Sequence, residues 1–324
     1  MMDFGKVLGR AWEITWRWKI LWVLGFLAAL GQGSGAPQTN YSFSGDEFDR
    51  FGFPFGESAE QFFLALSGLI LVLICIFLII AIALWVVSVI ARGGLIAGVL
   101  QVEEEGETSF SKAWAGGARK FWTLFGLGIL AAIPLILMLI IGGIILFSGI
   151  FFGIGLLDVD QAAGITSLVL VSIICGGFLC CGLFFLVIIL EQIRIYGERA
   201  AILEDLGWID AFKRGWEVLK DNLGATIIFW LIFFALGIVI FGISFVIVLA
   251  LAAPLFGLFF VADPGLWWFG PICIGGLLGT IIFALIRSIV VAFTSATWTL
   301  AYREMTAPEH PDLENLELIE PESG

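Results

Sequence analysis

The segment LEDLGWIDAFKRGWEVLKDNLGAT, residues 203–226, decides how the rest of the chain is organised. Apolar and small residues recur in it at the i, i+3, i+4, i+7 spacing of one helical face, and charged residues fill the other face. The apolar face consists of Trp208, Ala211, Phe212, Gly215, Trp216, Leu219 and Leu223. Because the segment runs straight into a long apolar stretch, we expect an amphipathic helix that lies flat on a membrane surface before the chain enters the bilayer.

The composition is typical of an integral membrane protein. Hydrophobic residues make up 60% of the chain and charged residues 14%, whereas about a quarter of the residues in a soluble domain are charged. A sixth, shorter apolar run at 20–35 has the length of a signal-peptide core, but the long Trp-rich segment before it favours an uncleaved first span. The other five runs exceed the roughly 20 residues that a helix needs to cross the hydrocarbon core, and they cover about 61–91, 121–157, 162–190, 223–262 and 264–286.

The positions of the charges are more informative than the net charge of −12. All basic residues except Arg50 and Arg287 fall before the first apolar run, between the second and third, between the fourth and fifth, or after the sixth. The remaining connections are acidic. By the positive-inside rule, the basic segments lie in the cytoplasm. We therefore predict an all-α fold with six transmembrane helices and both termini cytoplasmic; the resemblance to a bacterial family given below implies a multi-pass protein of a prokaryotic plasma membrane.

The amphipathic pattern of 203–226 occurs twice more, in 1–19 and in 108–121. In one common register, the three segments place a small residue at the same position: Ala11, Gly117 and Gly215. This similarity predicts one polytopic domain of three units, at about 1–102, 103–204 and 205–302, each with an interfacial helix followed by two spans. The alternative is that any cytoplasmic amphipathic helix shows this spacing. The interfacial anchors are expected to be Trp12, Trp114, Trp216, Arg10 and Arg214.

Residues that commonly carry catalysis are scarce. The one histidine, His310, lies in 303–324, which we expect to be a disordered acidic tail in the cytoplasm. The cysteines all fall inside apolar runs, and they are interpreted as small buried hydrophobic residues: Cys75, Cys175, Cys180, Cys181 and Cys273. We therefore predict no catalytic site, no metal site and no cofactor.

Ionisable residues within the spans are the candidates for contact with a ligand or a lipid, because charge in hydrocarbon is costly. Arg287 is predicted at mid-membrane, about 20 Å from the cytoplasmic end of the last span if that span is helical. Two interpretations stay open for it, a contact to an anion or lipid headgroup and a structural ion pair. Glu191 and Arg194 lie one helical turn apart at the inner end of the fourth span, where an interfacial ion pair is the preferred interpretation.

Residues 200–229 resemble the conserved cytoplasmic segment of the membrane domain associated with bacterial glycerophosphoryl diester phosphodiesterases and of its stand-alone relatives. Gly215 stands where that family has Ser. The end of the last span is also similar, with Leu300, Tyr302 and Glu304 as rough equivalents. The resemblance implies a membrane module without the catalytic domain, so hydrolysis is not implied. The matching residues are Leu203, Glu204, Leu206, Gly207, Ala211, Phe212, Lys213, Arg214 and Trp216.

The resemblance and the basic surface helices together suggest a function. We expect a non-enzymatic membrane protein that supports lipid-related or envelope processes by contact with membrane lipids, anionic ones in particular. A membrane protein partner or a second copy of the chain is a further expected contact, and nucleic acid is not. The alternative is a transporter or lipid translocator with a cavity between the units near Arg287.

Overall fold

The structure is a computed structural model that describes residues 3–31, 59–157, 161–261 and 269–307, and these residues form α-helices and no β-strand. Five of the helices in these ranges are long and apolar enough to cross a membrane, so the chain is an α-helical membrane protein. Most of the predicted acidic tail and the connections around 32–58, 158–160 and 262–268 lie outside the described residues. The helices are α1 (Phe4–Arg17), α2 (Ile20–Leu30), α4 (Ala59–Glu105), α5 (Phe110–Arg119), α6 (Phe121–Leu157), α7 (Gln161–Leu203), α8 (Trp208–Asp221), α9 (Leu223–Val261) and α10 (Phe269–Thr306).

The three predicted amphipathic segments form the short helices α1, α5 and α8. Two of them begin at a side-chain cap. The carboxylate of Asp3 accepts a hydrogen bond from the backbone N–H of Lys6 at 3.1 Å, and the hydroxyl of Ser109 accepts one from that of Lys112 at 3.3 Å. These caps satisfy N–H groups that have no partner within the first helical turn. Local sequence therefore defines where these helices start.

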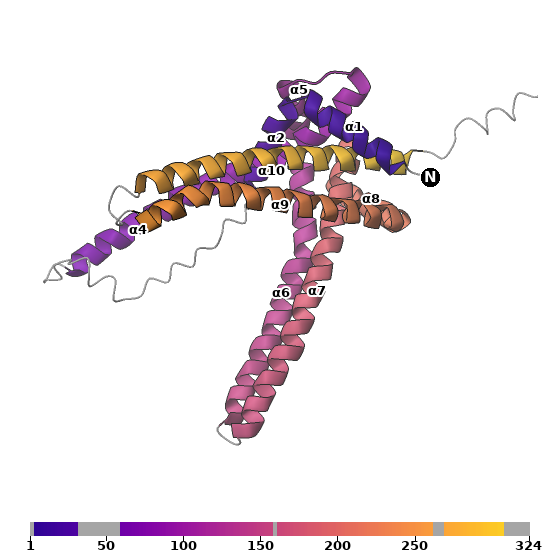
Figure 1. Cartoon of the computed structure of the whole chain (residues 1–324). Helices are drawn as coiled ribbons and strands as arrows, with labels where there is room; N and C mark the ends of the chain where they lie inside the picture. The colour runs from indigo at the N-terminus through magenta and orange to yellow at the C-terminus, as the bar shows by residue number, and fades with distance from the viewer. Residues whose placement is uncertain (1–2, 32–58, 158–160, 262–268, 308–324) are drawn as a thin grey trace, which may run out of the picture.

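Each amphipathic helix packs against a long helix. For α5 and α8 this is the helix that precedes it in the chain, and for α1 it is the last helix of the chain. α5 lies on α4, α8 lies on α7, and α1 lies on α10, the last helix of the chain (Figure 1). Gly117 of α5 approaches the carbonyl of Ile90 and the backbone of Gly94, and neither contact leaves room for a Cβ atom. The small residue predicted at this register position is thus required by a close helix–helix contact.

Gly215 of α8 makes the corresponding approach to α7. A Cβ atom at Gly215 would lie 2.5 Å from the carbonyl oxygen of Ile193 and 2.8 Å from the nitrogen of Gly197. α8 therefore packs on α7 through the same kind of close contact by which α5 packs on α4. The third small residue, Ala11, is fully buried on α1.

The short apolar run at the N-terminus forms α2, which at 11 residues is about 16 Å long. It is packed between α10 and α4. Leu21 and Leu24 are fully buried, and the hydroxyl of Ser88 donates to the carbonyl of Ala28 at 2.8 Å. α2 is therefore part of the protein core.

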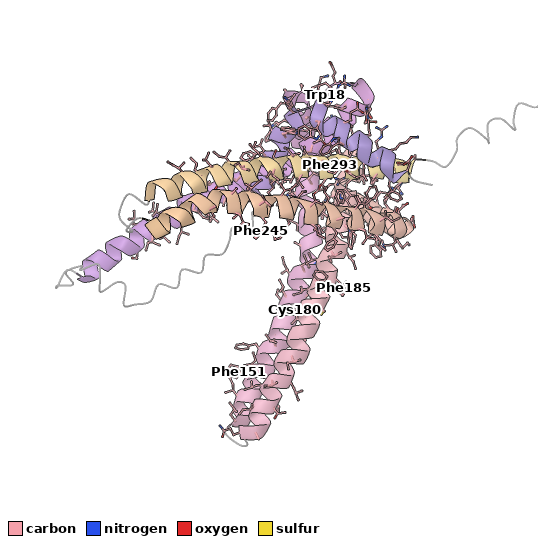
Figure 2. The ribbon with its side chains drawn as sticks, in the orientation of Figure 1. Trp18, Phe151, Cys180, Phe185, Phe245 and Phe293 are labelled. Carbon is pink, nitrogen blue, oxygen red and sulfur yellow. The ribbon has the colours of Figure 1, made fainter. Side chains whose placement is uncertain are left out.

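The long helices leave this packed region in two directions. α6 and α7 pair as a hairpin that points away from α4, α9 and α10 (Figure 1). Phe151, Cys180 and Phe185 lie along this hairpin, far from the core residue Phe293 (Figure 2). Buried side chains gather where the helices meet, and the outer parts expose apolar side chains, as expected for surfaces solvated by lipid.

The prediction that the cysteines are buried is wrong for Cys75, Cys180 and Cys181, whose side chains are exposed on the long helices and are not disulfide-bonded. An apolar run in a membrane protein does not require a protein core, because lipid chains are as apolar as a leucine side chain. The side chains of Cys175 and Cys273 lie outside the described part of the structure.

Candidate functional site

A group of charged side chains lies where α4, α7 and α10 meet, and we call it the charge cluster: Arg92, Glu191, Arg194, Glu198 and Arg199. Four of these residues come from α7, spaced so that one side of the helix carries them. Glu198 and Arg199 are buried, Arg92 and Arg194 are half-buried, and Glu191 is exposed. Helix periodicity therefore gathers the cluster on α7, and packing adds Arg92 from α4.

Arg194 is the centre of the ion pairs in the charge cluster. Its guanidinium group pairs with Glu191, as expected from their spacing of one turn, and with Glu198 at 2.6 Å. Glu198 also forms an ion pair with Arg92, with Nη1 and Oε1 separated by 3.7 Å. Both carboxylates of the cluster are thus already engaged by guanidinium groups.

Arg199 is different, because no carboxylate among the described residues pairs with it. Only 4% of its surface is exposed. Its Nη atoms donate to two backbone carbonyls, those of Ile195 at 2.5 Å and Ser295 at 3.3 Å, and its Nε atom has no acceptor. A buried cation without a counter-charge is strongly unfavourable. The charge cluster therefore carries an excess of positive charge.

The charge cluster lines a cavity of about 300 Å³ between α4, α7 and α10, which we call the central cavity. Thr294, Ser295 and Trp298 of α10 complete its wall. Two buried donor atoms of the cluster have no hydrogen-bond acceptor, Nε of Arg92 and Nε of Arg199. Unpaired buried donors of this kind are uncommon, and they mark a place where an acceptor can bind.

Two further cavities adjoin the central cavity along the same face of α7. The α6-side cavity, about 350 Å³, lies between α4, α6 and α7, and it shares Arg92, Arg194 and Glu198 with the central cavity. The α9-side cavity, about 390 Å³, lies between α7, α9 and α10 and shares Glu191 and Trp298, among others, with the central cavity. The site is therefore a positively charged centre that adjoins a mainly apolar cavity beside α9 and a cavity beside α6 with charged residues at one end and apolar residues at the other.

The three residues predicted to contact a ligand separate into two places. Glu191 and Arg194 belong to the charge cluster, whereas Arg287 is a half-buried residue of α10 that lines none of the three cavities. Arg287 makes no hydrogen bond or ion pair within the described residues, and the hydroxyl of its neighbour Ser288 donates to the carbonyl of Trp22 on α2. The structure does not bring Arg287 to the charge cluster.

The sequence residues 13–303 match a family of unknown function (DUF7544). The chain belongs to the DUF7544 family. No curated protein and no solved structure matches the chain. The region shared with the DUF7544 family extends from α1 to α10, so it includes the complete charge cluster and its cavities.

The arginines predicted as interfacial anchors are both paired with acids. Arg10 contacts Glu103 at 2.8 Å and Glu13 at 2.9 Å. Arg214 contacts Glu204 at 3.3 Å and Glu217 at 3.5 Å. Each therefore connects an amphipathic helix to the end of a long helix.

The tryptophans predicted as anchors lie at the surface of the amphipathic helices. Trp12 is 53% exposed and Trp216 47%. Trp12 also contacts Phe293 edge to face, with ring centroids 5.8 Å apart, and the half-buried Trp114 stacks on Phe110 at the same distance. Each of these tryptophans therefore leaves part of its ring exposed, and Trp12 and Trp114 also pack against a neighbouring aromatic ring.

Sequence reasoning missed Arg92, Glu198 and Arg199 as site residues. Each lies near the end of a long helix, beyond its apolar run. From the sequence alone, such a charged residue is assigned to the connection between two spans. The spacing from Glu191 to Arg199 was the available signal, since a helix that continues past the apolar run places them on one side. α7 does continue to Leu203. Arg92 gives no such local signal.

Proposed function

We propose that the protein is a non-enzymatic lipid-binding protein of the prokaryotic plasma membrane. The observation that carries this proposal is the charge cluster, in which excess guanidinium charge and unpaired N–H donors adjoin a mainly apolar cavity and a second cavity that is apolar away from the cluster. An anionic phospholipid has the complementary chemistry, with phosphate oxygens that accept charge-assisted hydrogen bonds and acyl chains that fill apolar space.

The proposed topology has six spans with both termini in the cytoplasm. α4, α6, α7, α9 and α10 supply five of them, and α2 is proposed as a short first span that is retained in the mature protein. Support for its retention comes from its burial, because loss of α2 would uncover Leu21, Leu24 and the Ser88 contact. The distribution of basic residues supports placing α1, α5 and α8 on the cytoplasmic side.

We further propose that the chain is a threefold repeat of an interfacial helix and two spans. The support is the way each interfacial helix is seated, with α5 on α4, α8 on α7 and α1 on α10. Gly117 meets Gly94 as Gly215 meets Gly197.

The resemblance to membrane domains associated with glycerophosphodiester hydrolases favours a lipid-related role on independent grounds.

The geometry favours binding over the other functions considered. Both carboxylates of the charge cluster accept from guanidinium groups, so neither is free to act as a base. A transporter with a cavity near Arg287 is the alternative, and the cavities described above do not support it because Arg287 lines none of them.

The proposal is tested by native mass spectrometry of the full chain purified in a mild detergent. We expect anionic phospholipids to be enriched on the protein relative to their share of the membrane from which it was extracted. A phosphatidylcholine-doped preparation serves as the reference for neutral lipid. Retention of every lipid class in proportion to its abundance would contradict the proposed function.

A further inference from the structure

We propose that the site takes a two-chain anionic phospholipid that straddles the charge cluster on one face of α7, with its phosphate in the central cavity and one acyl chain in each flanking cavity. This inference rests on the lipid-binding function proposed above and specifies its ligand.

The phosphate position follows from the two arginines whose Nε atoms lack an acceptor. Arg92 on α4 and Arg199 on α7 both line the central cavity. Arg92 shares a carboxylate with Arg194, whereas Arg199 meets only backbone carbonyls. A phosphate in this cavity carries several oxygens that can accept from unpaired N–H donors, and it would add negative charge beside Arg199, which no carboxylate contacts directly.

The size of the central cavity limits what it can hold. At about 300 Å³ it equals the lower limit of roughly 300–1,000 Å³ for small-molecule pockets. A headgroup with a phosphate fits such a volume, and acyl chains must then lie elsewhere. Small anionic headgroups are therefore preferred over large ones.

The flanking cavities provide two separate places for acyl chains. Trp85, Phe125 and Ile129 line the α6-side cavity, which is about 350 Å³. Phe233 and Leu236 line the α9-side cavity, which is about 390 Å³. Because both cavities share residues with the central cavity and all three meet the same face of α7, two chains from one headgroup can diverge from the charge cluster along that face.

A buried amide, that of Gln192, lies at the wall of the α9-side cavity next to the hydroxyl of Tyr196. Gln192 is 2% exposed and its side-chain oxygen accepts from the indole N–H of Trp230 at 2.9 Å. Its Nε2 atom has no acceptor. Since Gln192 and Trp230 both line this cavity, the ester carbonyl of a lipid is a chemically suitable acceptor at its entrance.

Two glycines allow each acyl-chain cavity to be filled separately. Gly128 lines the α6-side cavity and Gly237 lines the α9-side cavity, and a Cβ atom at either position meets nothing within 4 Å. Gly128→Leu and Gly237→Leu should therefore fold while occupying the space proposed for one chain. Gly242→Leu is the matched control, since its Cβ also meets open space and it lines neither cavity.

The test measures binding of defined ligands to delipidated full-length protein in detergent. The ligands are phosphatidylglycerol, its single-chain lyso form, phosphatidylcholine and inorganic phosphate. We expect the wild type to bind phosphatidylglycerol roughly tenfold more tightly than the lyso form or phosphatidylcholine. Gly128→Leu and Gly237→Leu should each reduce phosphatidylglycerol binding to the level of the lyso form, and Gly242→Leu should leave it unchanged.

The arginine variants test the phosphate position. Arg92→Gln and Arg199→Gln should each weaken phosphatidylglycerol binding roughly tenfold, whereas Arg10→Gln, which lies outside the cavities, should not. Arg92→Lys keeps the charge and removes the Nε donor, so it replaces Arg92→Gln if that variant does not fold.

The failures of the two proposals are distinguishable. Equal binding of phosphatidylglycerol and its lyso form, or wild-type binding by both filled variants, would overturn the straddling arrangement and leave lipid binding intact. Inorganic phosphate that binds as tightly as the lipid would identify a free anion as the ligand. Absence of binding by every lipid would refute the proposed function itself.

Discussion

The hydroxyl of Tyr302 donates a hydrogen bond to the carboxylate of Glu204, 98 residues earlier in the chain. Tyr302 is fully buried, and the second oxygen of Glu204 is 3.3 Å from Nε of Arg214. One carboxylate thus joins the ends of α7 and α10 to α8. These three residues therefore hold the ends of three helices together.

Tyr302→Phe tests this junction. Loss of the hydroxyl leaves Glu204 with one partner and should lower the free energy of unfolding by about 1 kcal/mol. The measurement is the thermal unfolding midpoint in detergent, followed by tryptophan fluorescence. Glu217→Gln is the control, because Glu217 also pairs with Arg214 but is exposed. Equal midpoints for Tyr302→Phe and the wild type would show that the hydrogen bond contributes nothing.

Gly117→Ala and Gly215→Ala test the seating of the amphipathic helices. In both cases the new methyl group would meet backbone atoms of the neighbouring long helix, and backbone cannot rotate away as a side chain can. We expect each substitution to lower the free energy of unfolding by about 1–3 kcal/mol.

Gly224→Ala is the matched control for these two variants, because a Cβ atom there meets nothing within 4 Å. Alanine favours helix over glycine, so this control should be neutral or slightly stabilising. If all three variants unfold at the same temperature, the close helix contacts are not required for stability.

Asp205 gives a prediction about pH. Its carboxylate lies 2.5 Å from Nζ of Lys120, and this contact lowers the pKa of Asp205 below its ordinary value. A lowered pKa in the folded state stabilises the protein above the unfolded-state pKa, and that stabilisation is lost as the pH falls through the folded-state pKa.

Asp205→Asn should therefore lower the unfolding midpoint at pH 7, and the difference from the wild type should begin to shrink below about pH 4 and disappear once the pH is below the lowered pKa of Asp205 in the folded state. Asparagine suits the position because Asp205 has φ 55, a backbone region that asparagine tolerates. A difference that persists unchanged at low pH would assign the effect to backbone conformation instead of the ion pair.

The proposed topology predicts which side of the membrane each segment faces. In a variant with all native cysteines replaced, Lys213→Cys on α8 should react with a membrane-impermeant maleimide only after spheroplasts are lysed. Asp158→Cys, in the second acidic connection, should react in intact spheroplasts. Labelling of Lys213→Cys in intact spheroplasts would place α8 on the outside and reverse the topology.

Arg287→Leu distinguishes lipid binding at the charge cluster from transport past Arg287. Arg287 makes no ion pair within the described parts of the chain and lines none of the cavities at the cluster. We expect unchanged retention of anionic lipid, measured by native mass spectrometry beside Arg199→Gln. A loss of retention equal to that of Arg199→Gln would move the site to the middle of α10.

The elements that depend on local sequence were predictable. The periodicity of 203–226 predicts α8, and Asp3 and Ser109 cap the helices expected to follow them. The small residue shared by the three segments corresponds to real close contacts at Gly117 and Gly215. In each case the signal lies within a few residues of the feature, so no knowledge of the tertiary fold is needed.

The composition of the candidate site depends on tertiary packing, and the sequence could not reveal it. Arg92 reaches the cluster only because α4 crosses α7. Arg199 is buried because α10 covers it, with a hydrogen bond to the carbonyl of Ser295. Hydropathy also cannot distinguish burial in protein from exposure to lipid, which is why Cys180 was misplaced.

The packing of α2 against α10 has a consequence for the biogenesis of the protein. The contact between Trp22 and Ser288 joins residues 266 positions apart, so at roughly 5–20 residues per second the ribosome needs about 13–53 s to supply the second partner after the first. Throughout that interval the face of α2 around Gly25, which contacts Ser288 and Ala292 in the complete protein, must be covered by lipid or by the insertion machinery. The nascent protein is therefore most vulnerable to degradation before its last helix is made, and truncation within α10 should destabilise the first helices of the chain.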